Sequence, residues 1–315
     1  MKNVLTDSRV KLTLIFFISA ISLPSMSYES AKTKYTIKVN DRQTHYDRMS
    51  FFFLPKEKVN ISIYDGSTPV PFSVSNANTS KVSTYTSVIA DKGSRQEVFL
   101  YPNGLDKKIT VILFSMVPYT DIKNGKLGSY TIGQYPETRL NNLAIYDPPL
   151  GFVKVEKDST DFLVSPHYKL GQFLCKQSEG FPKYIVLQTR LLRKLEFLTD
   201  AVNESGISTK GFTIMSGYRT PYYNSLIKNK KYSRHQWGGA ADIYIDESPK
   251  NNVMDDLNKD GKVNLDDAKM LSRLIESFYA KHIYKPFVGG LGLYSANAAH
   301  GPFVHVDVRG TRARW

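Results

Sequence analysis

Cysteine and long apolar runs are the two things this sequence has least of. Cys175 is the only cysteine among 315 residues, so the chain cannot form an internal disulfide. We interpret Cys175, in the run Phe173-Leu174-Cys175, as a small buried hydrophobic residue. Beyond residue 27 no apolar stretch is long enough to cross a membrane. The chain also lacks an arginine-rich arm or a basic helix, so we expect no nucleic-acid partner.

Acidic residues are too few to balance the basic ones. The sequence has 42 Lys and Arg against 29 Asp and Glu, a formal net charge of +13. Such a balance suits an anionic partner, for example an anionic cell-wall polymer or anionic lipid. With 41% hydrophobic and 12% aromatic residues, the chain is typical of globular proteins and long enough for two domains of ordinary size. The sequence does not indicate the oligomeric state.

The N-terminus has the pattern of a secretory signal peptide over residues 1–27. Lys2, Arg9 and Lys11 precede an apolar segment at 12–23, which is short for a membrane span. Small residues in Ser25-Met26-Ser27 predict cleavage before Tyr28. We therefore expect secretion across the inner membrane to the periplasm or cell envelope, with an uncleaved N-terminal anchor as the alternative.

Residues 28–147 are predicted to form an all-β domain. Strand-like segments at 35–39, 59–64, 97–101 and 108–114 are separated by turn signals such as Asp65-Gly66 and Asn103-Gly104. This spacing favours a small β-sandwich of immunoglobulin-like type, a spacer or wall-binding module without chemistry of its own.

Residues 148–315 are predicted to form an α+β domain with a small antiparallel sheet, and Pro148-Pro149-Leu150-Gly151 marks the boundary. Apolar residues recur at helical spacing from Leu187 to Val202, with Gly206 at the expected C-cap. Residues 212–215 read as a buried strand, and Thr220-Pro221 as the start of a second helix.

Two stretches carry ligands for a metal. In Ser233-Arg234-His235-Gln236-Trp237-Gly238-Gly239-Ala240-Ala241-Asp242, six residues separate His235 from Asp242. The two glycines predict a bend that folds His235 back towards a strand carrying Asp242. Near the C-terminus, Phe303-Val304-His305-Val306-Asp307 adds a second histidine. Two imidazoles and one carboxylate match the ligand set of an open, catalytic zinc site.

These stretches, with Ser216-Gly217-Tyr218-Arg219 and the ending Arg312-Ala313-Arg314-Trp315, resemble the D-Ala-D-Ala carboxypeptidase family of zinc peptidases. The family includes carboxypeptidases, dipeptidases and endopeptidases that act on bacterial peptidoglycan. The resemblance covers roughly residues 160–315.

The resemblance implies a zinc ion on His235, Asp242 and His305. It also implies that Arg219 binds a substrate carboxylate or carbonyl, or stabilises the oxyanion, which suits a planar fork of donors. We expect Ser233, Tyr218 and Trp237, which lie in the same motifs, to contact substrate with it.

The motifs do not specify which residue acts as the general base. Many family members carry an acidic residue three positions before the last histidine, where this chain has Pro302. Alternation along a strand places Asp307 on the same face as His305. Asp307 is then either the base or a carboxylate that orients a ligand histidine, and His300 is the second candidate for the base.

An insertion at 255–267 has the pattern of a calcium loop with Gly261 at its turn. Asp256, Asn258, Asp260, Asn264 and Asp267 offer side-chain oxygens, and Lys262 offers its carbonyl oxygen. Asp267 stands where an EF-hand prefers Glu, as in dockerin-type loops. We expect a structural calcium ion here, and an ion-free acidic loop is the alternative.

The sequence therefore predicts a secreted zinc metallopeptidase that cleaves peptidoglycan stem peptides or cross-links. A non-catalytic wall-binding or adhesion protein with the same fold is the alternative, and a zinc enzyme acting on another amide is a third. The bond cleaved, D,D or L,D, is not specified by the sequence.

Overall fold

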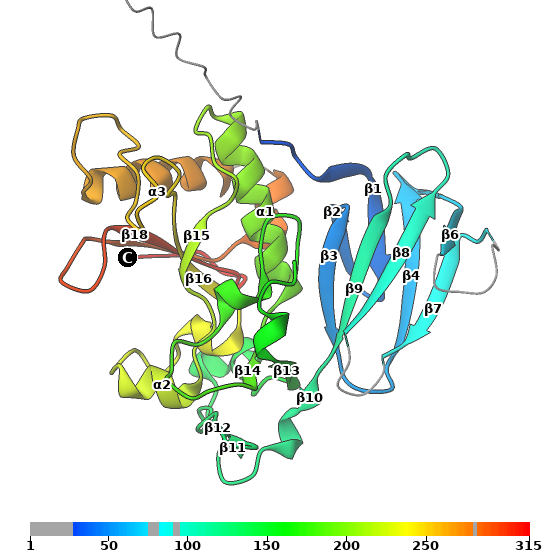
Figure 1. The fold of residues 1–315 in the computed structure, drawn as a ribbon, viewed down its shortest axis with the longest axis horizontal. Helices are drawn as coiled ribbons and strands as arrows, with labels where there is room; N and C mark the ends of the chain where they lie inside the picture. The colour runs from blue at the N-terminus through cyan, green and yellow to red at the C-terminus, as the bar shows by residue number, and fades with distance from the viewer. Residues whose placement is uncertain (1–27, 75–81, 91–94, 280–281) are drawn as a thin grey trace, which may run out of the picture.

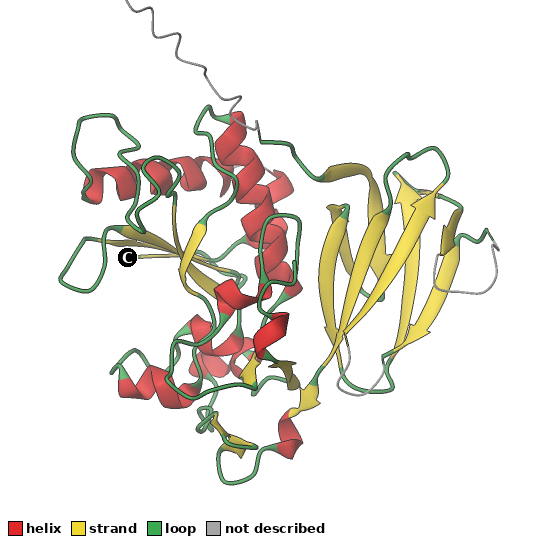
Figure 2. Ribbon diagram, in the orientation of Figure 1, coloured by secondary structure: helices red, strands yellow, loops and turns green. Residues whose placement is uncertain are grey.

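The computed structural model describes residues 28–74, 82–90, 95–279 and 282–315. A part made only of strands lies beside a part that contains the α-helices (Figures 1 and 2). The coarse expectation of a mixed, strand-rich α+β fold is confirmed, whereas the immunoglobulin-like type of the first part stays a prediction. The predicted signal peptide lies outside the described residues. Among those residues, no helix combines the length and apolar character that crossing a bilayer requires.

The all-strand part consists of two sheets. One contains β2 (Arg42–Tyr46), β1 (Lys32–Val39), β4 (Lys58–Asp65), β5 (Thr68–Pro69) and β7 (Tyr85–Ile89). The other contains β3 (Arg48–Phe53), β9 (Ile109–Ser115), β8 (Arg95–Pro102) and β6 (Phe72–Val74). Pairing is antiparallel except between β3 and β9. Alternate residues of β4, from Val59 to Ile63, are fully buried, as the period of a strand requires. The four strands predicted from the sequence are confirmed as β1, β4, β8 and β9.

The chain leaves this sandwich earlier than the expected boundary at Pro148. Directly after β9, β10 (Val117–Pro118) pairs with β13 (Gly151–Val155), which pairs with β14 (Lys183–Ile185). A hairpin of β11 (Lys126–Leu127) and β12 (Tyr130–Thr131) follows β10. Residues 117–147 thus belong by contact to the second part: Trp237 Nε1 donates to the Asp147 carbonyl oxygen at 2.8 Å. Pro148, Pro149 and Leu150 lead directly into β13, whose first residue is Gly151.

Five strands form the sheet that carries the site. Their order is β15 (Thr213–Ser216), β16 (Ala240–Tyr244), β18 (Phe303–Asp307), β17 (Gly290–Tyr294) and β19 (Ala313–Arg314). All pairs are antiparallel except β17 with β19. The predicted pairing of residues 291–294 with 303–308 is confirmed. In register, Asp242 of β16 lies opposite His305 of β18.

The described residues of this part contain three α-helices. They are α1 (Thr189–Glu204), α2 (Pro221–Leu226) and α3 (Leu265–Tyr279). The predicted helix is confirmed as α1, and Gly206 after its end has a positive φ of 92°. Thr220 caps α2, accepting from Tyr223 N at 3.0 Å, with Pro221 at the first helical position, as predicted. Helix α3 packs against β17 and β18.

Short 3-10 segments connect these elements. They are η1 (Tyr119–Asp121), η2 (Leu140–Asn142), η3 (Ala144–Tyr146), η4 (Lys157–Ser159), η5 (Leu170–Phe173), η6 (Arg234–Trp237) and η7 (His282–Phe287).

Helix α1 joins the two parts and lies between them in Figure 1. On the sandwich side, Asp200 accepts hydrogen bonds from Tyr28 Oη and Tyr46 Oη, both at 2.6 Å. On the sheet side, Lys194 Nζ donates to the Asp307 carbonyl oxygen at 2.7 Å. The same helix therefore contacts the sandwich and the strand that carries His305.

Candidate metal centre

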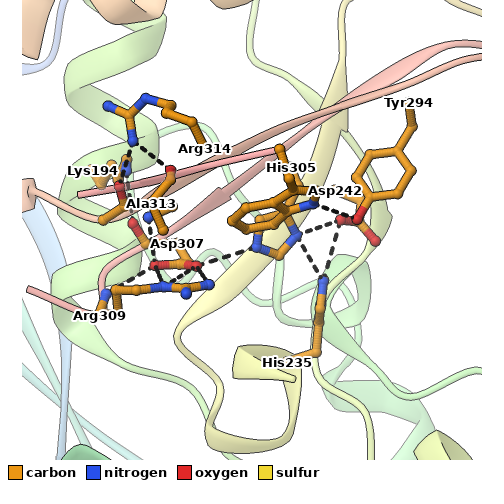
Figure 3. A network of polar contacts seen from close by, with 12 residues as sticks. Lys194, His235, Asp242, Tyr294, His305, Asp307, Arg309, Ala313 and Arg314 are labelled. Carbon is orange, nitrogen blue, oxygen red and sulfur yellow. Dashed lines mark hydrogen bonds and ion pairs between the residues drawn. The ribbon is translucent and has the colours of Figure 1, made fainter. Parts of the chain in front are cut away.

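His235, Asp242 and His305 converge at one buried point, contributed by η6, β16 and β18 (Figure 3). His305 Nδ1 lies 2.8 Å from Asp242 Oδ1, and His235 Nε2 lies 3.2 Å from both of these atoms. All three residues are buried. Within the described parts of the chain, this is the one group of three His, Cys, Asp or Glu residues whose potential ligand atoms lie within 4.8 Å of one another.

The bend predicted at Gly238 brings His235 to this point. Gly238 ends η6 with φ of 60°, and a Cβ there would overlap the backbone carbonyl of Val186. The His235 ring is fixed by a 2.6 Å hydrogen bond from Nδ1 to the Gly217 carbonyl oxygen. Because a carbonyl can only accept, Nδ1 carries the proton and Nε2 presents its lone pair to the cluster.

Asp242 is held by an arginine on its far oxygen. Arg219 Nη2 donates to Asp242 Oδ2 at 2.6 Å, and Arg219 Nε donates to Ser216 Oγ at 2.9 Å. Oδ1 is left facing the two histidines. Burial alone would raise the pKa of Asp242, but the neighbouring His235 and His305 outweigh burial and hold that pKa well below its usual range. Asp242 is therefore an anionic ligand at neutral pH.

Asp307 contacts His305 from the opposite side. His305 Nε2 lies 3.4 Å from Asp307 Oδ2, whereas Nδ1 faces Asp242. Asp307 also accepts from Gly290 N at 2.8 Å and from Arg309 Nε at 2.9 Å. Burial opposes its charge, but hydrogen bonds from His305 and Arg309 hold the pKa of Asp307 well below its usual range. Of the two roles left open by the sequence, this geometry fits a carboxylate that orients His305 and does not fit a general base facing substrate.

Glycines at the start of β17 leave space for these side chains. A Cβ on Gly289 or Gly290 would overlap Asp307, and a Cβ on Gly292 would overlap the indole of Trp315. Trp315 in turn lies 5.1 Å, between ring centroids, from His305 and donates from Nε1 to Tyr294 Oη at 2.7 Å. The run Gly289–Gly292 is therefore a packing requirement of the site.

The donor set fits a transition-metal ion. Two imidazole nitrogens and one carboxylate oxygen are typical of catalytic zinc. Burial lowers the pKa of His235, so its Nε2 is free of a proton at neutral pH. Burial alone would also lower the pKa of His305, but its bonds to Asp242 and Asp307 raise it instead. A cation at this point would take the place of the proton on His305 Nδ1, the ring atom that faces Asp242.

A cavity of about 780 Å³ opens onto the cluster. Besides the three ligands, its walls include Arg219 and Ser233, both predicted from the sequence, and His300. His300 Nδ1 faces the Gly301 carbonyl oxygen at 2.8 Å, and Nε2 lies 2.9 Å from Asn297 Nδ2. His300 is thus on the cavity wall but outside hydrogen-bonding distance of the ligands in this arrangement.

Two residues predicted to contact substrate do not line the cavity. Tyr218 is buried, and its Oη lies 3.2 Å from Tyr135 Oη, away from the cavity. Trp237 is also buried, with its indole directed to the backbone of Asp147. Each neighbours a site residue in sequence, but its side chain enters the core behind the site.

Sequence reasoning missed several residues of the cavity wall. They are Arg234, Lys230, Lys231, Tyr232, Tyr294, Arg309, Trp315, Tyr146 and Leu140. Arg234 was visible between Ser233 and His235, and Trp315 was visible in the ending Arg-x-Trp. No local pattern relates Tyr146 to residues so distant in sequence.

The predicted calcium loop folds onto its own backbone. Asp267 is buried, and its carboxylate accepts from Leu257 N and Asn264 N, both at 2.8 Å. Asp256 Oδ2 accepts from Gly261 N at 2.7 Å. Asp267 and Asn264 thus also cap the start of α3. The carboxylates of this loop are not among the convergent metal-binding groups of the described residues, and the calcium ion stays a prediction.

Comparison of the chain with protein-family models and with curated proteins finds no match. The resemblance to zinc peptidases therefore depends on the motif residues and on the geometry that they adopt.

Proposed function

We propose that this protein is a zinc-dependent metallopeptidase that hydrolyses peptide bonds of peptidoglycan stem peptides or cross-links. The observation that carries the proposal is the convergence of His235, Asp242 and His305 beside an open cavity. Each ligand is oriented by a further group: the Gly217 carbonyl, Arg219 or Asp307. Such a supported set is expected of a metal centre rather than of three residues buried by chance.

A bound zinc ion would supply a Lewis acid and a water of lowered pKa. The chain itself supplies the rest. Arg219, which donates to Asp242 and Ser216, holds the Asp242 carboxylate in place and lines the cavity beside it. Asp307 keeps Nδ1 of His305 directed to the cluster. His300 is the wall residue whose imidazole can accept a proton if it releases Asn297.

Peptidoglycan as substrate is supported by the resemblance and by net charge. Peptidoglycan peptides carry free carboxylates, which suit a chain of charge +13. Export to the periplasm or envelope belongs to the same proposal. The immunoglobulin-like sandwich, joined to the catalytic part through α1, would serve as a spacer or wall-binding module.

One observation favours the alternative of a non-catalytic wall-binding protein. Among the described residues that line the cavity, Asp242 is the only acid, and it is a metal ligand. Pro302 stands where related enzymes carry an acidic base, and it is buried. The peptidase proposal therefore requires His300 to take the role of the base.

Digestion of purified peptidoglycan by the mature protein distinguishes the two. We expect new fragments by mass spectrometry that disappear with a chelator and in a His235→Ala variant, and the fragment masses would name the bond. Zinc bound at one ion per chain with no fragments released would reject hydrolysis and favour the binding protein.

A further inference from the structure

Arg234 is a buried cation in the wall of the cavity, and no carboxylate of the described residues lies within ion-pair distance of it. It is 3% exposed, and its Nη1 donates to the Ile145 carbonyl oxygen at 2.7 Å. Its guanidinium carbon lies 5.0 Å from the ring centroid of Tyr146 and 5.2 Å from that of Trp237. Its Nε is buried without a hydrogen-bond partner in the described structure. A buried donor left unpaired is costly, so such an atom calls for an explanation.

The other two arginines of the cavity are compensated. Arg219 pairs with Asp242, and Arg309 pairs with Asp307. Arg234 has no ion pair among the described residues, and a guanidinium group carries its charge at neutral pH. Lys230 and Lys231 line the same cavity, are exposed, and have no carboxylate partner in the described parts of the chain. The cavity wall thus carries positive charge without an ion-pair partner, and at Arg234 this charge is buried.

We propose that Arg234 forms a carboxylate subsite next to the metal centre, so that the ligand is a peptide with a free carboxylate close to the scissile bond. A guanidinium presents parallel donors that match a carboxylate, and the flanking aromatic rings hold its plane. Lys230 and Lys231 attract the anion at the mouth of the cavity. Arg219, whose Nε and Nη2 are engaged by Ser216 and Asp242, is less free for this task.

This inference rests on the proposed function for its substrate, but binding can be tested apart from catalysis. The probe is a mixture of soluble muropeptides, incubated with the protein until its composition no longer changes, so that no turnover disturbs the measurement. Half of the mixture is converted to methylamides at its carboxyl groups with a carbodiimide. Binding of both halves to the zinc-loaded full chain is measured by calorimetry.

We expect the wild-type protein to bind the carboxylates at least roughly tenfold more tightly than the amides, as for a charge-assisted hydrogen bond. Arg234→Gln should remove this preference, and Arg234→Lys should keep part of it. Arg273→Gln is the matched control, because Arg273 is exposed on α3 outside the cavity. Zinc content and melting temperature show whether each variant is folded.

Equal binding of acids and amides by the wild-type protein would overturn the subsite, whatever the variants do. Retention of the preference in a folded Arg234→Gln variant would also overturn it. The results also distinguish a failure of the subsite proposal from a failure of the peptidase proposal. Carboxylate-dependent binding without cleavage would reject the peptidase and keep the subsite, and cleavage without carboxylate preference would do the reverse.

Discussion

Replacing Asp307 by Asn tests whether this carboxylate orients a metal ligand or acts as the base. The side chain is fully buried and contacts His305 Nε2, Gly290 N and the guanidinium of Arg309. Asn keeps the size of the side chain and one acceptor oxygen, but it removes the negative charge. The Asn side chain has one oxygen to accept from these donors, and its NH₂ group would face one of them without forming a hydrogen bond.

The expected magnitude follows from the position of Asp307 behind His305. Loss of a carboxylate that hydrogen-bonds a ligand histidine lowers metal affinity by roughly 10- to 100-fold. This corresponds to about 1.4–2.7 kcal/mol of binding free energy. The His305 ring also loses the partner that directs Nδ1 to Asp242.

Zinc affinity is measured by competition with a chromophoric chelator at constant pH. Asp266→Asn on α3 is the matched control, because Asp266 is exposed and its ion pair within the described residues is with Lys269. We expect unchanged affinity in the control and the stated loss in Asp307→Asn. Unchanged zinc affinity together with lost hydrolysis would refute the orienting role and identify Asp307 as the base.

Two further predictions concern the surroundings of the site. Gly290→Ala should lower the free energy of unfolding in urea by about 1–3 kcal/mol, because the added Cβ would overlap Asp307 and the Trp315 ring. Gly180→Ala is the control and should change this free energy little, because the space around Gly180 is open. Equal effects of the two substitutions would contradict the packing argument. Burial lowers the pKa of Lys194 from 10.5 to about 7. Between these two pH values the unfolded chain therefore binds more protons than the folded chain. The free energy of unfolding of the wild type, relative to that of Lys194→Met, should thus rise with pH from about 7 to 10. If the difference in free energy of unfolding between the two proteins, measured in urea titrations, does not change with pH, the pKa of Lys194 is not lowered in the folded protein.

Local patterns predicted the elements that carry the ligands. The Gly238-Gly239 bend and the alternation at 303–308 depend on residues close in sequence, and both are confirmed. The helix α1, the cap at Thr220 and the buried Cys175 are confirmed for the same reason. Each of these features is decided by backbone conformation or by a short hydrophobic period.

Features that depend on tertiary contact were predicted less well. Trp237 and Tyr218 lie in the motifs, but which side of the chain faces the core is set by Asp147 and Tyr135, far away in sequence. The pairing of β10 with β13, which spans the predicted boundary at Pro148, is a contact between segments distant in sequence that no local pattern indicated. The positive wall around Arg234 could not be recognised until the cavity brought its residues together.

We propose above all that His235, Asp242 and His305 together hold one metal ion. The most direct measurement is the zinc content of the dialysed protein by mass spectrometry, with Ala variants of each ligand and His45→Ala as a control in the sandwich. We predict one zinc per chain in the wild type and the control, and its loss in each ligand variant that remains folded. A folded wild type that takes up no metal, or ligand variants that keep their zinc, would contradict the claim.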